Sequence, residues 1–218
     1  MNQRRSSFTG IPSEVLQKSK LGLEKEGLRV TREGRIAQSR HPLTLGSALT
    51  HPSITTDFSE AQLELITPPG VSAREALANL ADTESFVHRN LSDELVWPAS
   101  MPCRLDSDEE IPIACYGRSE DGMTKHVYRR GLSYRYGRMM QAIAGVHFNF
   151  SFSDELWPLL QEKLGEQSDL NSFITDRYMA TLRNLQRYNW LTLYLFGASP
   201  TVHPCLLYTS DAADDETS

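Results

Sequence analysis

The sequence has no apolar run that approaches the ~20 residues a membrane-spanning helix needs. Its first residues, MNQRRSSFTGIPSEV, contain basic side chains with no apolar stretch behind them, so we expect no secretory signal peptide. Cysteine is scarce: the three cysteines, Cys103, Cys115 and Cys205, show no CxxC or zinc spacing, and their odd number argues against a disulfide framework. These absences favour a reducing, cytoplasmic setting without a membrane partner.

Positive charge is also in deficit. The 218 residues include 22 Lys and Arg against 28 Asp and Glu, a formal net charge of −6. A strongly basic nucleic-acid binder is therefore excluded as the leading interpretation. Hydrophobic residues make up 39% and charged residues 23%, which suits a packed core in one or two domains.

Several motifs of enzyme chemistry are missing. The sequence contains no GxGxxG and no phosphate-binding P-loop, so ATP, if bound, is held through metal ions and not through a glycine-rich cradle. It also contains no HExxH or HxH, which disfavours a metal-dependent hydrolase that uses an activated water.

Periodicity and turn signals predict an α+β protein. A capping box at Ser72–Glu75 marks the start of one helix. Strands and helices do not alternate regularly, which favours an antiparallel sheet over a doubly wound parallel one. The predicted strands are 21–31 with a return at 35–37, most of 54–69, and 146–152; the predicted helices are 12–20, 72–90, 125–144, 154–164 and 169–196, with a long connection at 97–123.

Carboxylates recur on two of these strands. Glu24 and Glu26 are two residues apart, so both project from one face about 7 Å from each other. In the segment 54–69, Glu60 and Glu64 share a face as well, and Asp57 precedes them. Two interpretations stay open: a solvated outer face, or a hard-cation site built from oxygen ligands.

The strand GVHFNFSF adds polar groups of another kind. His147, Asn149 and Ser151 face one side, opposite a row of apolar side chains. The histidine is either structural or part of a polar cavity wall, where imidazole joins carboxylates around a divalent metal. The basic stretch 128–138, YRRGLSYRYGR, is either an exposed helix face or a site for phosphate or carboxylate. These residues indicate a carboxylate-lined face that suits a divalent metal, but they do not select a reaction.

Five stretches taken together resemble glutamate–cysteine ligase (gamma-glutamylcysteine synthetase) of the proteobacterial type. They occur in order and cover nearly all of residues 20–204. The stretches are GLEKEGLRV (22–30), LGSALTHPSITTDFSEAQLELITPP (45–69), DELVWPASMPCRL (93–105), YRRGLSYRYGRMMQAIAGVHFNFS (128–151) and YLFGASP (194–200).

The resemblance implies a fold and a reaction. The fold is an antiparallel sheet of the glutamine synthetase-like funnel type with flanking helices, incomplete in this chain. The reaction is ATP- and Mg²⁺-dependent: the γ-carboxylate of L-glutamate becomes an acyl phosphate, and the amine of L-cysteine attacks it to give γ-glutamylcysteine, the first step of glutathione biosynthesis. The expected partners are these small-molecule substrates and no nucleic acid. The alternative is an inactive truncated fragment with residual metal or nucleotide binding.

The resemblance also implies roles for particular residues. Arg129 is the catalytic candidate and is expected to contact substrate as well. The metal residues implied are Glu24, Glu26, Glu64 and His147; the substrate-binding residues are Asp57, Tyr128, Arg129 and Gln141; and Asn149 is implied at the cofactor.

Two departures from the family pattern bear on domain organisation. Family members are longer, so residues 1–204 are expected to form the N-terminal part of a catalytic domain whose further strands and substrate-binding arginines lie elsewhere. The tail 205–218, CLLYTSDAADDETS, has no family counterpart; we interpret it as a disordered artefact of sequence assembly, with a natural acidic tail as the alternative.

Overall fold

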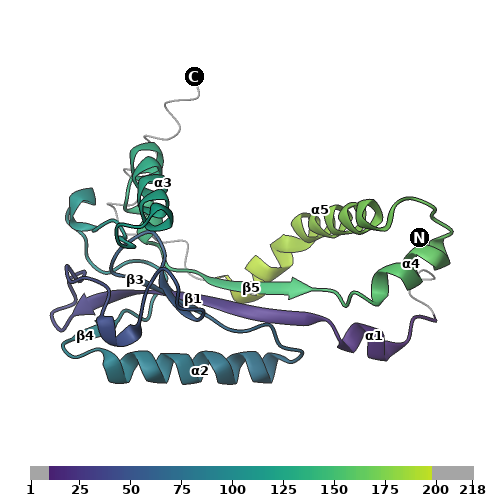
Figure 1. The fold of residues 1–218 in the computed structure, drawn as a ribbon, viewed down its shortest axis with the longest axis horizontal. Helices are drawn as coiled ribbons and strands as arrows, with labels where there is room; N and C mark the ends of the chain where they lie inside the picture. Colours follow the sequence, from purple (N-terminus) through teal and green to yellow (C-terminus); the bar gives the residue numbers. More distant parts are fainter. Residues whose placement is uncertain (1–9, 198–218) are drawn as a thin grey trace. The chain divides into compact units, whose positions relative to one another are not determined.

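The computed structural model describes residues 10–197 and divides them into two compact units. The sheet unit comprises residues 21–149, and the helical unit comprises residues 10–20 together with 150–197. The ribbon in Figure 1 follows both units along the chain. The predicted boundary at 204 and the predicted tail 205–218 lie outside the described residues and stay predictions.

The sheet unit is built around one long central strand. Strand β1 (Lys20–Thr31) pairs antiparallel with β3 (Gln62–Ile66) and β4 (Glu94–Val96), and β2 (Ile54–Thr56) pairs antiparallel with β3. The strand order is β2-β3-β1-β4, and β5 (Val146–Ser151) also pairs with β1. The predicted α+β fold with an antiparallel sheet is confirmed.

The prediction of a single strand over 54–69 is wrong. A turn divides this segment into β2 and β3: the Gln62 N–H donates to the Ser59 carbonyl at 2.9 Å, and the Ser59 hydroxyl accepts the Ala61 N–H at 3.1 Å. Glu60 lies in this turn and does not share a strand face with Glu64. Alternation alone missed the turn because the serine forms it with its own side chain.

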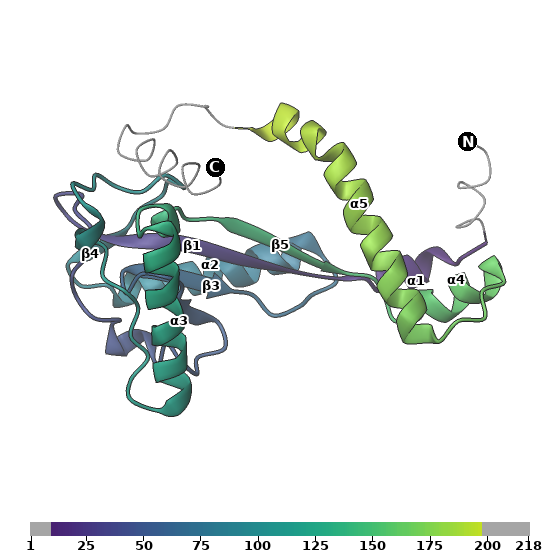
Figure 2. The same cartoon turned by 90° about the horizontal axis from the view of Figure 1, so that it is seen from above.

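Helix α2 (Ala73–Asn90) confirms the prediction from the capping box. The Ser72 hydroxyl accepts the Glu75 N–H at 3.2 Å and so satisfies one of the free donors of the first turn. The helix buries Leu80 and Val87 in a core cluster with Leu63 and Leu65 of β3. Both ribbon views show α2 beside the sheet (Figures 1 and 2).

Helix α3 (Glu120–Tyr136) differs from the predicted helix at 125–144. Ser119 caps its start by accepting the Gly122 N–H, and Gly137 ends it with a φ of 72°, which a residue with a side chain rarely adopts. The 3₁₀ turn η3 (Met140–Ala142) follows. The long connection contains η2 (Asp108–Glu110) and is preceded by β4, which the sequence did not predict.

Other short elements complete the sheet unit. The turn η1 (Leu43–Leu45) interrupts the loop at 38–53. The expected return at 35–37 forms no strand and makes only isolated bridges, from Ile36 to Val30 and from Arg35 to Arg104. The main core cluster includes Leu28, Val30 and Phe58, each no more than 3% exposed. This core fixes β1 and the turn after β2, which carry candidate site residues.

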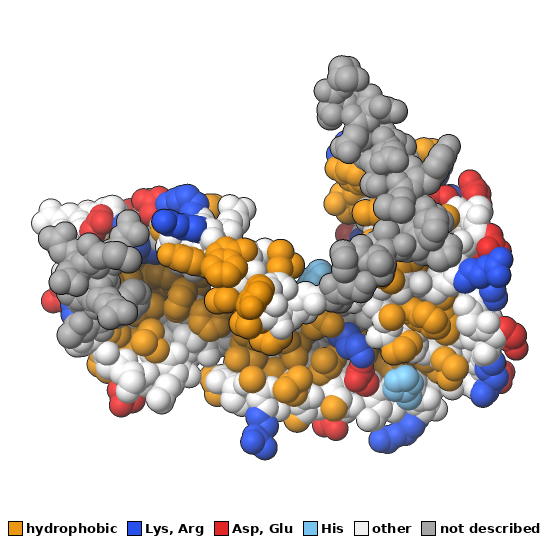
Figure 3. All heavy atoms as spheres, turned by 180° about the vertical axis from the view of Figure 1, so that it is seen from behind, with side chains coloured by type: hydrophobic (Ala, Val, Ile, Leu, Met, Phe, Trp, Pro, Cys, Tyr) orange, Lys and Arg blue, Asp and Glu red, His pale blue; other side chains and the backbone are white. Residues whose placement is uncertain are grey.

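The helical unit contains α1 (Ser13–Gln17), α4 (Leu156–Leu164) and α5 (Leu170–Phe196), as predicted to within a few residues. Trp157, Leu160 and Phe173 form its buried cluster. Many apolar side chains stay exposed in the described structure, and Figure 3 shows hydrophobic groups on one face of the molecule. None of the helices within residues 10–197 is both long and apolar enough to cross a membrane.

Candidate metal and substrate site

The sheet brings together the acidic residues that the sequence placed far apart. Glu24 and Glu26 lie on β1, and the β1–β3 register sets Glu26 directly opposite Glu64. Asp57 follows β2, and His147 lies on β5. The predicted metal residues thus occupy three paired strands, with Asp57 at the adjacent turn, and we refer to these five residues as the acidic cluster.

His147 stands between the two carboxylates of β1. Its Nδ1 lies 3.2 Å from Glu24 Oε2, and its Nε2 lies 3.7 Å from Glu26 Oε1. The other oxygen of Glu24 accepts a hydrogen bond from Asn149 Nδ2 at 2.8 Å. The side chain of Asn149, implied at the cofactor by the family resemblance, therefore contacts a predicted metal residue.

Glu26 is fixed more firmly than Glu24. Its Oε2 accepts the Gly145 N–H at 2.8 Å and the Gln62 side-chain amide at 3.3 Å. Burial raises the pKa of Glu26, as does the negative charge of Asp57, while the Gly145 N–H, His147 and Gln62 act in the opposite direction. Gly145 has a steric role too, because a Cβ there would lie 2.8 Å from His147 Nε2.

Glu64 carries the clearest electrostatic signal. Burial, followed by the negative charges of Asp57, Glu24 and Glu26, raises its pKa to about 7, and His147 only partly offsets this. Burial and nearby negative charge both disfavour the ionised form of a carboxyl group, so a cation held beside Glu64 would favour that form.

The donor set of the cluster fits a divalent metal ion. Carboxylate oxygens are the ligands that Mg²⁺ and Ca²⁺ prefer, and imidazole joins them in many divalent sites. In the part of the chain that the structure describes, no group of three or more His, Cys, Asp or Glu side chains is arranged to hold an ion directly. The fit therefore rests on donor chemistry and charge, with Glu24, Glu26, Glu64 and His147 as the side chains that would hold it.

Arg129 approaches the cluster from α3. Its Nε donates to the main-chain carbonyl of Asp57 at 2.5 Å, and its guanidinium lies 4.7 Å from the centre of the Tyr116 ring. Among residues 10–197, no carboxylate forms an ion pair with Arg129. The guanidinium thus keeps a positive charge available to an anion.

The other predicted substrate residues are less closely tied to the cluster. Tyr128 neighbours Arg129 on α3 and is 64% exposed. Gln141 lies in η3, and its side chain forms no hydrogen bond to the acidic cluster within the described residues. The structure brings Arg129 to Asp57, whereas within residues 10–197 neither the Tyr128 nor the Gln141 side chain forms a hydrogen bond with the carboxylates.

Sequence reasoning missed three residues that support the site. Gln62 is fully buried and holds Glu26; its place in the alternation with Glu64 was a usable signal. Gly145, just before β5, donates its main-chain N–H to Glu26. The only sequence signal for this role was its position two residues before His147. Tyr116, in the long connection, gave no sequence signal at all.

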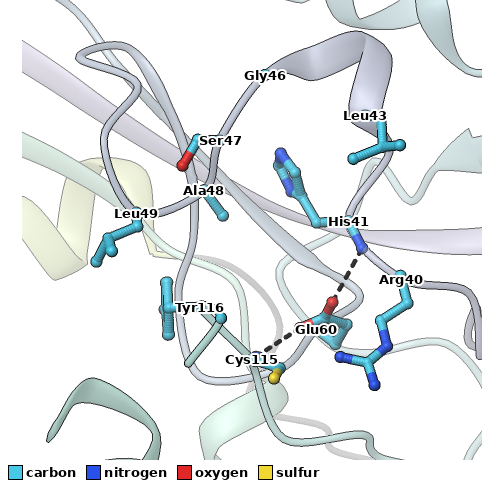
Figure 4. A pocket seen from close by; sticks show the side chains of 11 residues that line it. Arg40, His41, Leu43, Gly46, Ser47, Ala48, Leu49, Glu60, Cys115 and Tyr116 are labelled. Atoms are coloured by element: carbon cyan, nitrogen blue, oxygen red, sulfur yellow. Dashed lines mark hydrogen bonds between the residues drawn. The ribbon is translucent and has the colours of Figure 1, made fainter. Parts of the chain in front are cut away.

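A cavity of about 500 Å³ is lined in part by Glu60, from the turn after β2, and by Tyr116 (Figure 4). The Glu60 carboxylate accepts the main-chain N–H groups of His41 at 3.0 Å and Cys115 at 2.6 Å, drawn as dashed lines. Glu60 therefore has a structural role that ties three segments together, and it does not belong to the acidic cluster.

Solved structures of the same fold define the class of protein. The chain matches a glutamate–cysteine ligase from Francisella tularensis in complex with AMP at a TM-score of 0.77 and 44% identity, over 84% of this chain and 35% of that one. It also matches a bifunctional glutathione synthetase from Pasteurella multocida at a TM-score of 0.79 and 35% identity, over 91% of this chain and 25% of that one.

Sequence relatives identify the family. The family model for glutamate–cysteine ligase matches residues 9–217. The curated glutamate–cysteine ligase of Hahella chejuensis is 55% identical over 196 residues, 89% of this chain and 37% of the relative, and that of Pseudomonas putida KT2440 is 51% identical over 199 residues, 91% and 38%. The chain belongs to the glutamate–cysteine ligase family, as the resemblance predicted, and spans a little over a third of the length of these relatives.

Proposed function

We propose that this chain carries the metal-binding part of an ATP- and Mg²⁺-dependent ligase that joins the γ-carboxylate of L-glutamate to L-cysteine. The product is γ-glutamylcysteine, and the reaction is the first step of glutathione biosynthesis. The observation that carries the proposal is the acidic cluster, in which burial first, and then the negative charges of Asp57, Glu24 and Glu26, raise the pKa of Glu64 to about 7. Family membership and the AMP complex of the Francisella tularensis relative support it.

Phosphoryl transfer from ATP depends on charge neutralisation and positioning more than on covalent chemistry by the protein. Magnesium supplies that neutralisation at the phosphates when bound, and Glu24, Glu26, Glu64 and His147 would hold it. Asn149 orients Glu24, whereas Gly145 and Gln62 orient Glu26. Arg129, next to Asp57, binds a carboxylate or phosphate of the reactants through its guanidinium.

The second candidate is a chain that binds metal or nucleotide weakly but does not ligate. The favouring observation is length, since the chain covers only 37% of the Hahella chejuensis relative. For the 218-residue chain alone we expect no ADP release that depends on both glutamate and cysteine in the presence of magnesium. Robust turnover in that assay would exclude this second candidate.

Manganese binding tests the cluster directly in the chain as it stands. Mn²⁺ replaces Mg²⁺ at oxygen-rich sites. The concentration of unbound Mn²⁺ is measured by electron paramagnetic resonance. Glu24→Gln or Glu64→Gln is expected to weaken Mn²⁺ binding at least about tenfold, because each removes a ligand and a negative charge. His147→Ala is expected to weaken binding less, since neutral imidazole contributes no charge.

Glu84→Gln is the matched control. Glu84 is a half-buried glutamate of the same unit that pairs with Lys25, and within residues 10–197 it forms no hydrogen bond or ion pair with the acidic cluster. It should leave Mn²⁺ affinity unchanged, and circular dichroism should show that all variants keep their fold. Equal affinity in the wild type and Glu64→Gln would refute the metal role of Glu64. In a complete ligase, the same two Gln substitutions are expected to abolish product formation.

A further inference from the structure

Tyr116 touches two groups of the proposed site, although it lies in the long connection before α3. Its side chain is buried, with 6% of the residue exposed. The hydroxyl lies 2.6 Å from the main-chain carbonyl oxygen of Thr56 and 2.9 Å from that of Asp57. A phenol has one proton, so the two carbonyl groups at the end of β2 share it.

The segment around Tyr116 runs along the turn that carries Asp57. The Ala114 N–H donates to the Phe58 carbonyl at 2.9 Å, and the Glu60 N–H donates to the Pro112 carbonyl at 2.8 Å. With the bond from the Cys115 N–H to the Glu60 carboxylate, the turn is held along its whole length. Figure 4 shows Tyr116, Cys115 and Glu60 around the same cavity.

Two cationic side chains of α3 lie over the ring of Tyr116. The Arg129 guanidinium carbon lies 4.7 Å from the ring centre, and Lys125 Nζ lies 5.2 Å from it. Cations at these distances are attracted by the electron-rich face of the ring. Arg129 also donates to the Asp57 carbonyl, so one carbonyl oxygen receives hydrogen bonds from both Tyr116 and Arg129.

We propose that Tyr116 is a positioning residue that fixes the Asp57 turn and the Arg129 guanidinium relative to each other at the metal and substrate site. The hydroxyl sets the peptide that carries Asp57, and the ring face sets the plane of the guanidinium. This inference rests on the proposed function, because it assigns Tyr116 to the same site as Asp57 and Arg129.

Tyr116→Phe separates the two contacts, because it removes the hydroxyl and keeps the ring. Tyr178→Phe is the matched control: the Tyr178 hydroxyl also bonds to the main chain, accepting the Phe152 N–H at 3.2 Å, but it lies in the helical unit. The negative charge of Asp57 acts on Glu26 and Glu64. Because Tyr116→Phe frees the turn that carries Asp57, we expect it to weaken Mn²⁺ binding severalfold. Tyr178→Phe should leave Mn²⁺ binding unchanged.

A second measurement needs no metal. The Arg129 Nε–H signal reports the bond to the Asp57 carbonyl, and its exchange with water is followed by nuclear magnetic resonance. We expect this exchange to accelerate severalfold in Tyr116→Phe and to stay unchanged in Tyr178→Phe. A purely structural tyrosine would lower the unfolding temperature without moving either the Mn²⁺ affinity of the folded protein or the Arg129 signal.

The outcomes separate this inference from the proposed function. If the wild type does not bind Mn²⁺, the proposed metal site fails, and the Arg129 exchange rate alone decides the role of Tyr116. If the wild type binds Mn²⁺ and Tyr116→Phe matches it in affinity and in Arg129 exchange, the positioning role is overturned. Should Tyr116→Phe fail to fold, the wild type alone tests the link from α3: exchange of the Arg129 Nε–H as fast as in free arginine would overturn the inference.

Discussion

The sheet unit and the helical unit differ in how much of each is buried. In the sheet unit, even an arginine is fully enclosed: Arg29 is 0% exposed and bonds to Ser39, Glu94 and the Glu60 carbonyl. In the helical unit, the 27-residue helix α5 buries only Phe173. A helix such as α5 forms through hydrogen bonds between residues close in sequence, so it can exist with little burial. A buried polar group such as Arg29 needs partners from segments that are distant in sequence.

Apolar residues on α5 illustrate the same contrast. Leu182, Leu185 and Trp190 are each more than half exposed. The Leu and aromatic content of this stretch and its end at Gly197 predicted the helix correctly, yet they did not indicate which side chains are covered. Large exposed apolar areas mark interaction surfaces or aggregation risk, so the helical unit is where hydrophobic pattern and burial disagree most.

The largest expected difference between the units concerns their ion pairs. Arg29→Met leaves Glu94 without its buried partner, and we expect the free energy of unfolding to fall by about 3–5 kcal/mol. The matched change Lys18→Met breaks the exposed pair with Glu155 in the helical unit, where water screens both charges, and should lower it by at most about 1 kcal/mol. Urea unfolding followed by circular dichroism measures both; equal losses would contradict the comparison.

A second pair of substitutions compares apolar burial. Leu63, on β3, is 1% exposed, and Leu63→Ala should lower the free energy of unfolding by about 2–5 kcal/mol through lost contacts and a cavity. Leu185 on α5 is 60% exposed, and Leu185→Ala should change it by no more than about 0.5 kcal/mol, since alanine also favours the helix. A large loss in Leu185→Ala would show that α5 is buried in solution.

The smallest expected effect is a pH dependence confined to the sheet unit. The pKa of His41 is lowered, first by burial and then by the positive charge of Arg29, so the folded protein holds this histidine neutral at a pH where the unfolded chain protonates it. Its stabilising contribution is therefore present above the unfolded pKa of about 6.5 and is lost as the pH falls from that value through the lower pKa of the folded protein.

His41→Phe removes that titration. Between pH 8 and pH 5 the free energy of unfolding of the wild type is expected to fall by more than that of His41→Phe, as measured by urea titration at each pH. Parallel curves for the two proteins would show that burial of His41 does not affect stability. The comparison between the variants cancels the other titrating groups, including Glu64.

Much of the local structure was predictable from short stretches. The Ser72 capping box located α2, and Gly197 located the end of α5, because these signals act within a few residues. The turn at Ser59 and the end of α3 at Gly137 were missed, since each replaces a continuing pattern with one specific hydrogen bond or one positive φ. Alternation predicted that Glu24, Glu26 and His147 lie on polar strand faces, and the family resemblance assigned Glu64, Asp57 and Arg129 to the candidate site.

The sequence by itself determined the family, the antiparallel α+β class and the carboxylates available to a metal, because these depend on residue identity and spacing. Only the tertiary structure decided which carboxylates meet. It paired Glu26 with Glu64 across β1 and β3, removed Glu60 into a structural turn, and placed Tyr116 against Asp57 and Arg129. The physical reason is that strand register and loop packing are set by burial across distant segments, which no local pattern encodes.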